Sequence, residues 1–240
     1  MRNEMRHTTL TIFLLMALLL LFVRCEKNPI DSRKIETDWM TDIDGNRYQT
    51  VKIGDQWWLA DNLKVTRYAN GAPIPYCSDP TEWSQLSTGA YCEYDNDSSY
   101  VNLYGRLYNW YALVDSQSVA PAGWHIPDSE EWQKLIDYLG GASVAAGKLK
   151  ATGTDHWASP NTGATNQTGF TALPGGGRLY DGAYINITFD AIFWSSTEIS
   201  DLNASCRSMV CSGTNIYTIS RSKRSGFAVR LVKDTTPGQP

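Results

Sequence analysis

His125 has the sequence neighbours that a catalytic or metal-binding histidine would need. The stretch PAGWHIPDSEEW, residues 121–132, surrounds it with two tryptophans and three carboxylates. The same residues are also those that begin a helix, because Asp128 is a favourable N-cap and Glu131 completes a capping box. We therefore interpret the stretch as a helix entrance, in which a ring nitrogen of His125 satisfies a backbone carbonyl and has no catalytic role.

The chain contains no other pattern typical of a catalytic site. His156 is the only further histidine after the N-terminal segment, and the two lack HExxH spacing or a third ligand, so no zinc site is predicted. No nucleophile elbow or phosphate-binding loop is present, and the run Gly175–Gly177 after a proline is predicted to be a loop. The carboxylates are too dispersed to assign a glycosidase pair. We predict no catalytic residue, no resident metal and no cofactor.

Two main helices are predicted from apolar periodicity. The first covers Leu103–Val114, LYGRLYNWYALV, whose apolar residues fall near one face. The second follows Pro127, which forms a hydrophobic staple with Trp132, and it ends at Gly140-Gly141. The buried stripe of this second helix consists of Trp132, Leu135, Ile136 and Leu139.

Short runs of strand-forming residues alternate with turn residues elsewhere. Asp44-Gly45 divides TDIDGNRYQTVKI in the pattern of a β-hairpin. The later candidate strands are Tyr184–Phe189, Ala191–Ser195, Ser205–Ser212, Asn215–Ser220 and Gly226–Val232. These elements predict an α+β fold with two main helices, short and mostly antiparallel strands, and long glycine-rich loops.

The N-terminus predicts export. Arg2 and Arg6 precede the apolar run Leu10–Val23, which is too short to span a membrane and suits a signal-peptide core. Cys25 at its end resembles the lipid-acceptor cysteine of bacterial lipoproteins, although Arg24 stands where that signal usually has a small residue. An uncleaved signal anchor and a cleaved secretory signal are the alternatives. The lipoprotein interpretation places the protein at the outer membrane or cell surface.

The expected segments follow from this pattern. They are a signal peptide of residues 1–25, a polar tether of residues 26–38, one domain of residues 39–234 and a frayed tail of residues 235–240. Without the first 25 residues the chain has 18 basic and 24 acidic residues, so the basic face of a nucleic-acid-binding protein is not expected. The nine Trp and 13 Tyr suit partly wet binding faces as well as cores.

Several motifs in a fixed order resemble the Fibrobacter succinogenes major paralogous domain, which is abundant in exported lipoproteins of Bacteroidota and Fibrobacterota. They are DIDGNRYQTVKIGDQWWLADNLKV, YGRLYNWYAL, GWHIPDSEEW, AGKLKATGTDHW, TGFTALPGGGR, FWSSTE and GFAVRLVKD. The resemblance covers roughly residues 42–234. It implies a C-type-lectin-like fold, shared with formylglycine-generating enzymes, and it carries no established activity.

The cysteines depart from that family. Ala120 and Leu231 stand where many members have cysteines, as expected after loss of a disulfide. The four remaining candidates for disulfides are Cys77, Cys92, Cys206 and Cys211, which allow three pairings. Cys77 with Cys92 is the preferred bridge, because it closes a loop rich in turn residues.

Cys206 and Cys211 are harder to pair. Five residues of straight strand span about 16 Å, whereas a disulfide needs Cα atoms within about 7 Å, so direct pairing requires a bend. Their spacing also resembles the catalytic pair of formylglycine-generating enzymes, in which two thiolates bind Cu(I). A copper-dependent oxidase is therefore an alternative function.

The expected function is an exported, lipid-anchored binding module whose ligand is a glycan, a protein or an envelope polymer. A passive structural envelope protein is a further alternative. If Trp57-Trp58 lies on a strand, one tryptophan faces the core and one faces outward, and Trp58 is a candidate ligand-binding residue. The loop Asp95-Asn96-Asp97 offers oxygen ligands that would suit Ca²⁺. Trp194 and Glu198 are the last candidates, in a segment that lacks the Trp-Asn-Asp pattern of calcium-binding lectins.

Overall fold

The structure is a computed structural model that describes residues 35–235. The predicted signal peptide with its lipid-acceptor Cys25, most of the tether, and residues 236–240 lie outside the described residues. The first strand, β1 (Thr37–Thr41), begins two residues before the expected start of the domain at residue 39. None of the helices within residues 35–235 has the length and the apolar surface needed to cross a bilayer.

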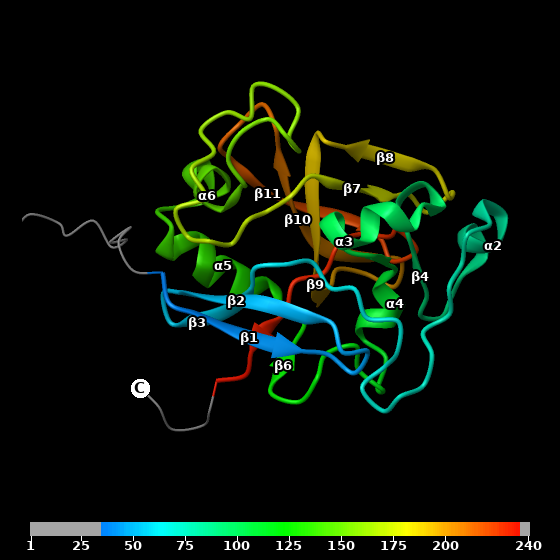
Figure 1. The fold of residues 1–240 in the computed structure, drawn as a ribbon. Helices are drawn as coiled ribbons and strands as arrows, with labels where there is room; N and C mark the ends of the chain where they lie inside the picture. The colour runs from blue at the N-terminus through cyan, green and yellow to red at the C-terminus, as the bar shows by residue number, and fades with distance from the viewer. Residues whose placement is uncertain (1–34, 236–240) are drawn as a thin grey trace, which may run out of the picture. The chain divides into compact units, whose positions relative to one another are not determined.

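The first sheet joins the two ends of the described chain (Figure 1). Its antiparallel strands, in spatial order, are β1, β2 (Arg47–Ile53), β3 (Gln56–Leu59), β12 (Val232–Lys233) and β6 (Trp124–His125). The predicted hairpin between β1 and β2 is confirmed. Its turn is held by Asp42, whose Oδ1 accepts hydrogen bonds of 2.9 Å from the amides of Asp44 and Asn46.

The second sheet contains the longest strands of the described residues. Its spatial order is β11 (Ile216–Ser222), β10 (Asn203–Val210), β9 (Asp190–Glu198), β7 (Gly175–Arg178) and β8 (Tyr184–Ile187). Its strands pair antiparallel except for β7 with β9. A two-stranded ladder joins β4 (Tyr91–Cys92) to β5 (Leu107–Tyr108). The fold is therefore mixed α and β and mostly sheet.

The glycine run that was predicted to be a loop is strand β7, so that prediction is wrong. A Cβ atom on Gly176 would lie 2.2 Å from the carbonyl oxygen of Ile185 on β8. A Cβ atom on Gly177 would lie 2.5 Å from the ring of Phe227. Glycine is needed in β7 because strand β8 and the ring of Phe227 approach its backbone too closely to leave room for a Cβ atom.

The helices are short, and one prediction fails among them. The longest are α5 (Ser129–Tyr138), as predicted, and α6 (Ala142–Leu149), which the sequence analysis missed. The others are α2 (Pro80–Gln85), α3 (Val101–Tyr104), α4 (Trp110–Leu113) and the single 3-10 turns Tyr94–Asn96 and Ser98–Tyr100.

The predicted helix Leu103–Val114 is divided into α3, strand β5 and α4. Gly105 ends α3 with φ of 75°, a value that side-chain-bearing residues rarely adopt. Asn109 then caps α4 by accepting a 3.1 Å hydrogen bond from the amide of Ala112. Apolar periodicity was a misleading signal, because the apolar residues do not share one buried face: Leu107 and Trp110 are buried, whereas Leu103 and Val114 are exposed.

The predicted strand Gly226–Val232 forms regular pairing only at its end, in β12. Before β12 it makes isolated bridges to the second sheet and the small ladder: Arg178↔Gly226, Phe193↔Ala228 and Tyr108↔Phe227. The amide of Leu63 also donates to the carbonyl of Val229 at 3.0 Å. This segment is the connection between the sheets, so it satisfies its backbone groups with many partners instead of one neighbouring strand.

The core uses most of the aromatic content. Five tryptophans are fully buried, namely Trp58, Trp83, Trp132, Trp157 and Trp194. Trp132 packs against Trp58 with ring centroids 4.7 Å apart.

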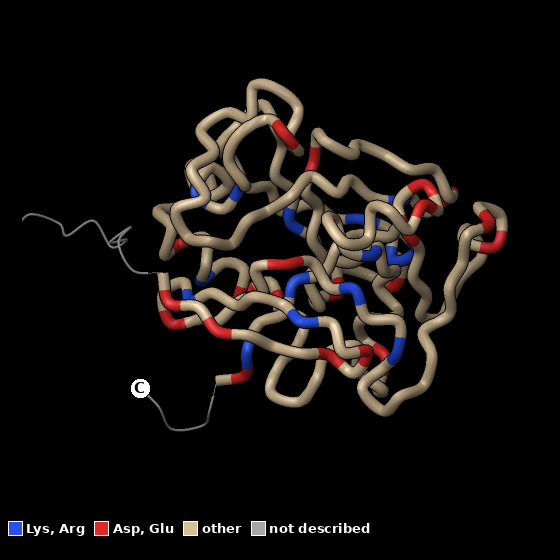
Figure 2. The backbone as a smooth tube through the Cα atoms, viewed as in Figure 1, with Lys and Arg blue, Asp and Glu red and all other residues tan. Residues whose placement is uncertain are grey.

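Over the described residues, Figure 2 shows acidic and basic residues interspersed along the trace. Several cations are buried, among them Arg178 and Arg230.

Candidate functional site

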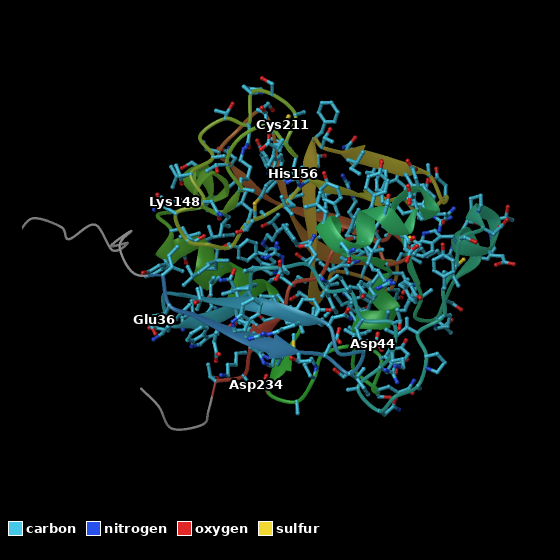
Figure 3. The ribbon with its side chains drawn as sticks, viewed as in Figure 1. Glu36, Asp44, Lys148, His156, Cys211 and Asp234 are labelled. Atoms are coloured by element: carbon cyan, nitrogen blue, oxygen red, sulfur yellow. The ribbon has the colours of Figure 1, made fainter. Side chains whose placement is uncertain are left out.

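His125 lies between two carboxylates rather than against a backbone carbonyl, so the expected partner is wrong. Its Nδ1 is 2.5 Å from Oδ1 of Asp234, and its Nε2 is 2.8 Å from Oε1 of Glu131. His125 lies in β6, Glu131 lies in helix α5, and Asp234 directly follows β12; Figure 3 labels Asp234 near the position of β6. The imidazole therefore connects the last residues of the described chain to the first turn of α5.

The capping box is confirmed. Oδ1 of Asp128 accepts 2.8 Å hydrogen bonds from the amides of Glu130 and Glu131. Oε2 of Glu131 accepts a 3.0 Å hydrogen bond from the amide of Asp128. Glu131 therefore has two functions, because one oxygen completes the cap and the other contacts His125.

The titration of His125 follows from this arrangement. Partial burial alone would lower its pKa, but the hydrogen bonds to Asp234 and Glu131 outweigh that effect and raise the pKa. The protonated ring can donate to both carboxylates, whereas a neutral ring can donate to only one. The site therefore favours the protonated ring over the neutral ring, and a protonated imidazole is a poor general base and a poor metal ligand.

A groove of about 350 Å³ borders this cluster. It is lined by His125, Ile126, Asp128, Glu130, Glu131, Lys134 and Ser196. Its carboxylates at Asp128 and Glu131 already accept hydrogen bonds from helix amides. Among residues 35–235, no group of three or more His, Cys, Asp or Glu side chains is arranged to hold a metal ion. The groove therefore borders the entrance of helix α5, where the carboxylates of Asp128 and Glu131 stabilise the first turn. His156 lies elsewhere, against the ring of Tyr104.

The four described cysteines are buried thiols. Strand β10 keeps an unbroken register with β11 from Asn203 to Met209, so it provides no bend between Cys206 and Cys211. Burial raises the pKa of the Cys206 thiol to about 12, and its Sγ lies 3.5 Å from the carbonyl oxygen of Ile219. This geometry does not bring two thiolates together. Cys77 and Cys92, by contrast, belong to one apolar cluster.

Two candidate ligand-binding residues are core residues, which corrects the sequence analysis. Trp58 and Trp194 are both 0% exposed. The Nε1 group of Trp194 donates a 2.8 Å hydrogen bond to the carbonyl of Tyr108. The strand alternation was right for QWWL, but Trp57 is the residue that faces outward, and Nζ of Lys233 lies 5.9 Å from its ring centroid.

The remaining candidates are exposed but have structural partners. Asp97 accepts a 2.8 Å hydrogen bond from the amide of Ser99. Asn96 accepts a 2.8 Å hydrogen bond from the hydroxyl of Tyr184. The oxygens of Asn96 and Asp97 thus stabilise the turn that was expected to suit Ca²⁺, and Asp95 lies in the same turn with a positive φ of 51°. Oε1 of Glu198 forms an ion pair of 2.8 Å with Nζ of Lys223.

A second groove, of about 230 Å³, carries exposed apolar side chains that the sequence analysis missed. It is lined by Tyr111, Tyr180, Leu202, Asn203, Ser222 and Arg224. Tyr180 is 55% exposed and Leu202 is 69% exposed, the highest value among the large hydrophobic residues within residues 35–235. The residues come from α4, from the β7–β8 and β9–β10 turns, and from the end of β11 and the loop that follows it.

Hydrogen bonds fix the walls of this groove. The amide of Lys223 donates to the carbonyl of Leu202 at 2.9 Å, which holds the β9–β10 turn against the end of β11. One guanidinium nitrogen of Arg224 donates to the carbonyl of Ser84 in α2 at 3.0 Å. The only sequence signals for the site were apolar residues inside turns, in LYDGAY and SDLN, where polar residues are usual.

The fold and these grooves define a mixed α/β domain with an exposed apolar groove, and its described residues include no group of three or more His, Cys, Asp or Glu side chains arranged to hold a metal ion. The chain matches the family described as Fibrobacter succinogenes major domain (Fib_succ_major) over residues 51–233. It therefore belongs to that family. Neither a curated protein nor a solved structure was found that matches the chain.

Proposed function

We propose that the protein is an exported, lipid-anchored cell-envelope protein whose domain binds a ligand in the groove at Tyr180 and Leu202. The observation that carries the proposal is the exposure of these two side chains beside polar groups, including Asn203 and Arg224. Ligand sites combine apolar contact surface with a few placed polar groups. Tyr180 and Leu202 have no core role that would explain an apolar residue at a turn.

The resemblance to C-type-lectin-like domains supports a binding function, because in such folds a sheet scaffold holds loops that contact the ligand. The groove is formed in the same way here, by turns at the ends of β7, β9 and β11. Its tyrosine rings suit the apolar faces of a glycan, and its amide and hydroxyl groups suit sugar hydroxyls. A protein segment or another envelope polymer is the remaining ligand class.

The binding proposal is tested by screening the purified chain against glycans, envelope polymers and envelope proteins, with and without Ca²⁺. The double variant Tyr180→Ala/Leu202→Ser should lose more than about tenfold in affinity for any ligand found. Phe189→Ala is the matched control, because Phe189 is 54% exposed but does not line the groove. Equal losses in the two variants, or binding unaffected by both, would place the ligand elsewhere. No binding in any arm would favour the passive structural alternative.

Lipidation is tested separately. Metabolic labelling with an alkyne fatty acid should mark the wild-type chain and leave Cys25→Ala unlabelled, with membrane association lost in the variant. Equal labelling of both would remove the lipid anchor from the proposal and leave the groove unaffected.

A further inference from the structure

The segments that carry Cys77 and Cys92 lie side by side as a short parallel pair. Tyr76 and Tyr91 form a parallel bridge. The amide of Tyr91 donates to the carbonyl of Pro75 at 2.9 Å, and the amide of Cys77 donates to the carbonyl of Tyr91 at 3.0 Å. Cys77 and Cys92 are the next residues on the two segments, so they are neighbours across the pair.

The two cysteine side chains point to the same face. Residues next to each other along a strand face opposite sides. The rings of Tyr76 and Tyr91 share one face, with centroids 5.4 Å apart. Cys77 and Cys92 therefore share the other face, where both are buried in the cluster around Trp83.

The spacing of such a pair suits a covalent bond. Paired strands lie about 4.8 Å apart, and disulfides form between Cα atoms about 4.4–6.8 Å apart. The other two cysteines do not compete, because Cys206 belongs to the main core cluster and Cys211 follows the end of β10. Figure 3 shows Cys211 beside the loops above α6, far from α2 and β4 as Figure 1 places them.

We propose that Cys77 and Cys92 form an intrachain disulfide in the exported protein. The proposal rests on the export part of the proposed function, because disulfides persist in oxidising compartments. The oxidant is the disulfide of a thiol–disulfide oxidoreductase. One cysteine thiolate attacks it to form a mixed disulfide, and the second thiolate displaces the enzyme. The chain loses two protons and two electrons, and the oxidoreductase leaves as a dithiol.

The bond would stabilise the buried cation Arg178. Its guanidinium donates to the carbonyl of Cys77 at 2.7 Å and to the carbonyl of Ser78 at 2.8 Å. It also lies over the rings of Trp83 at 4.6 Å and Tyr184 at 4.9 Å. A disulfide holds the first of these carbonyls beside β4, and it closes the segment 78–91 that carries α2. The disulfide would thereby keep the neutral carbonyl acceptor of Cys77 in place beside the buried, desolvated guanidinium of Arg178.

The pair should oxidise during folding rather than afterwards. Burial raises the pKa of Cys92 to about 12, and burial also raises the pKa of Cys77. Thiolate, the reactive form, is therefore scarce once Trp83 has packed over the pair. The reduced, folded protein should react slowly with oxidants, whereas the unfolded chain should react quickly.

The bond is tested by unfolding the full chain in denaturant without reductant, alkylating the free thiols, and digesting with a protease that cleaves after glutamate. Glu82 lies between the two cysteines, so cleavage there separates them unless they are linked. The expected result is one disulfide-linked pair of peptides containing Cys77 and Cys92, with Cys206 and Cys211 alkylated. Alkylation of all four, or a bridge to Cys206 or Cys211, would overturn the proposal.

A second experiment distinguishes the pairing of Cys77 with Cys92 from export of the protein to an oxidising compartment. The chain is unfolded, reduced and refolded in a glutathione redox buffer, then mapped in the same way. Linkage here but not in the exported protein would contradict export to an oxidising compartment, and absence of linkage in both would contradict the pairing itself. Cys77→Ser/Cys92→Ser should melt at a lower temperature than the wild type without reductant, and the difference should shrink when reductant is present. Cys206→Ser is the control: it keeps Cys77 and Cys92, so reductant should lower its melting temperature by as much as it lowers that of the wild type, whereas the double variant should be insensitive to reductant.

Discussion

The helix entrance offers the most direct test of the structural interpretation of the His125 stretch. In Asp128→Ala, the amides of Glu130 and Glu131 lose the carboxylate that accepts both at 2.8 Å. Other parts of the entrance remain, because Oε2 of Glu131 still bonds the amide of residue 128 and the amide of Ser129 still donates to Thr197 at 2.8 Å. Water can also reach the freed amides, because Asp128 is only half-buried.

The expected cost is therefore about 1 kcal/mol, in the middle of the 0.5–2 kcal/mol range of N-cap truncations. For a domain of this size that corresponds to a fall of about 2–4 °C in Tm. Asp128→Asn keeps an acceptor oxygen and should cost only a few tenths of a kcal/mol. Urea unfolding followed by tryptophan fluorescence measures all of these differences.

Asp137→Ala is the matched control, because it removes the same carboxylate from the last turn of the same helix. Asp137 is exposed and accepts a single 2.8 Å hydrogen bond from the side chain of Gln133. A negative charge at a helix C-terminus is unfavourable, so its loss should change the free energy of unfolding by less than about 0.5 kcal/mol. If Asp128→Ala were silent, or if the two alanine variants cost the same, the capping interpretation would be refuted.

Two further predictions concern the titratable groups. Because the folded-state pKa of His125 is raised, its contribution to stability is full below the unfolded value of about 6.5 and disappears as pH rises through the folded pKa. Asp234→Asn should therefore destabilise the protein more at about pH 5.5 than at pH 9, and an equal loss at both would contradict the ion-pair geometry. After Cu(I) reconstitution, the chain should show no oxygen uptake with a cysteine-containing peptide. Stoichiometric copper that is lost in both Cys206→Ser and Cys211→Ser, together with such uptake, would favour the oxidase alternative.

Local signals in the sequence predicted local structure well. Asp128, Glu131 and Pro127 act within a few residues of one another, so the start of α5 was correct. The hairpin at Asp44-Gly45 was correct for the same reason. These features depend on backbone amides within one turn of the chain. The residue types alone therefore determine which side chains can accept hydrogen bonds from those amides.

Features that depend on distant partners were not predictable in the same way. The helix expected at Leu103–Val114 fails because β5, in its middle, pairs with β4, an element outside the window of periodicity. Trp58 was taken for a surface residue because alternation gives two faces but does not say which is buried. The second partner of His125, Asp234, is contributed by the other end of the chain, so no spacing rule could have indicated it.

The motifs that resemble the family contain residues that hold the fold together, and the reason is physical. Arg230, in the closing motif GFAVRLVKD, donates to the carbonyls of Leu59 and Phe170 at 2.7 Å each and to the side chain of Asn62 at 2.6 Å. A buried guanidinium of this kind stabilises loops from several parts of the chain at once, because its five donors must all find acceptors.

A residue such as Arg230 is required by the fold and not by a ligand. The motifs therefore describe how the domain is held together. The side chains most exposed in the candidate groove, Tyr180 and Leu202, lie between motifs, as do Cys77 and Cys92. A family defined by its scaffold motifs can therefore present different grooves from the same sheets. The ligand of this member should accordingly be sought through its turns rather than through the residues it shares with its family.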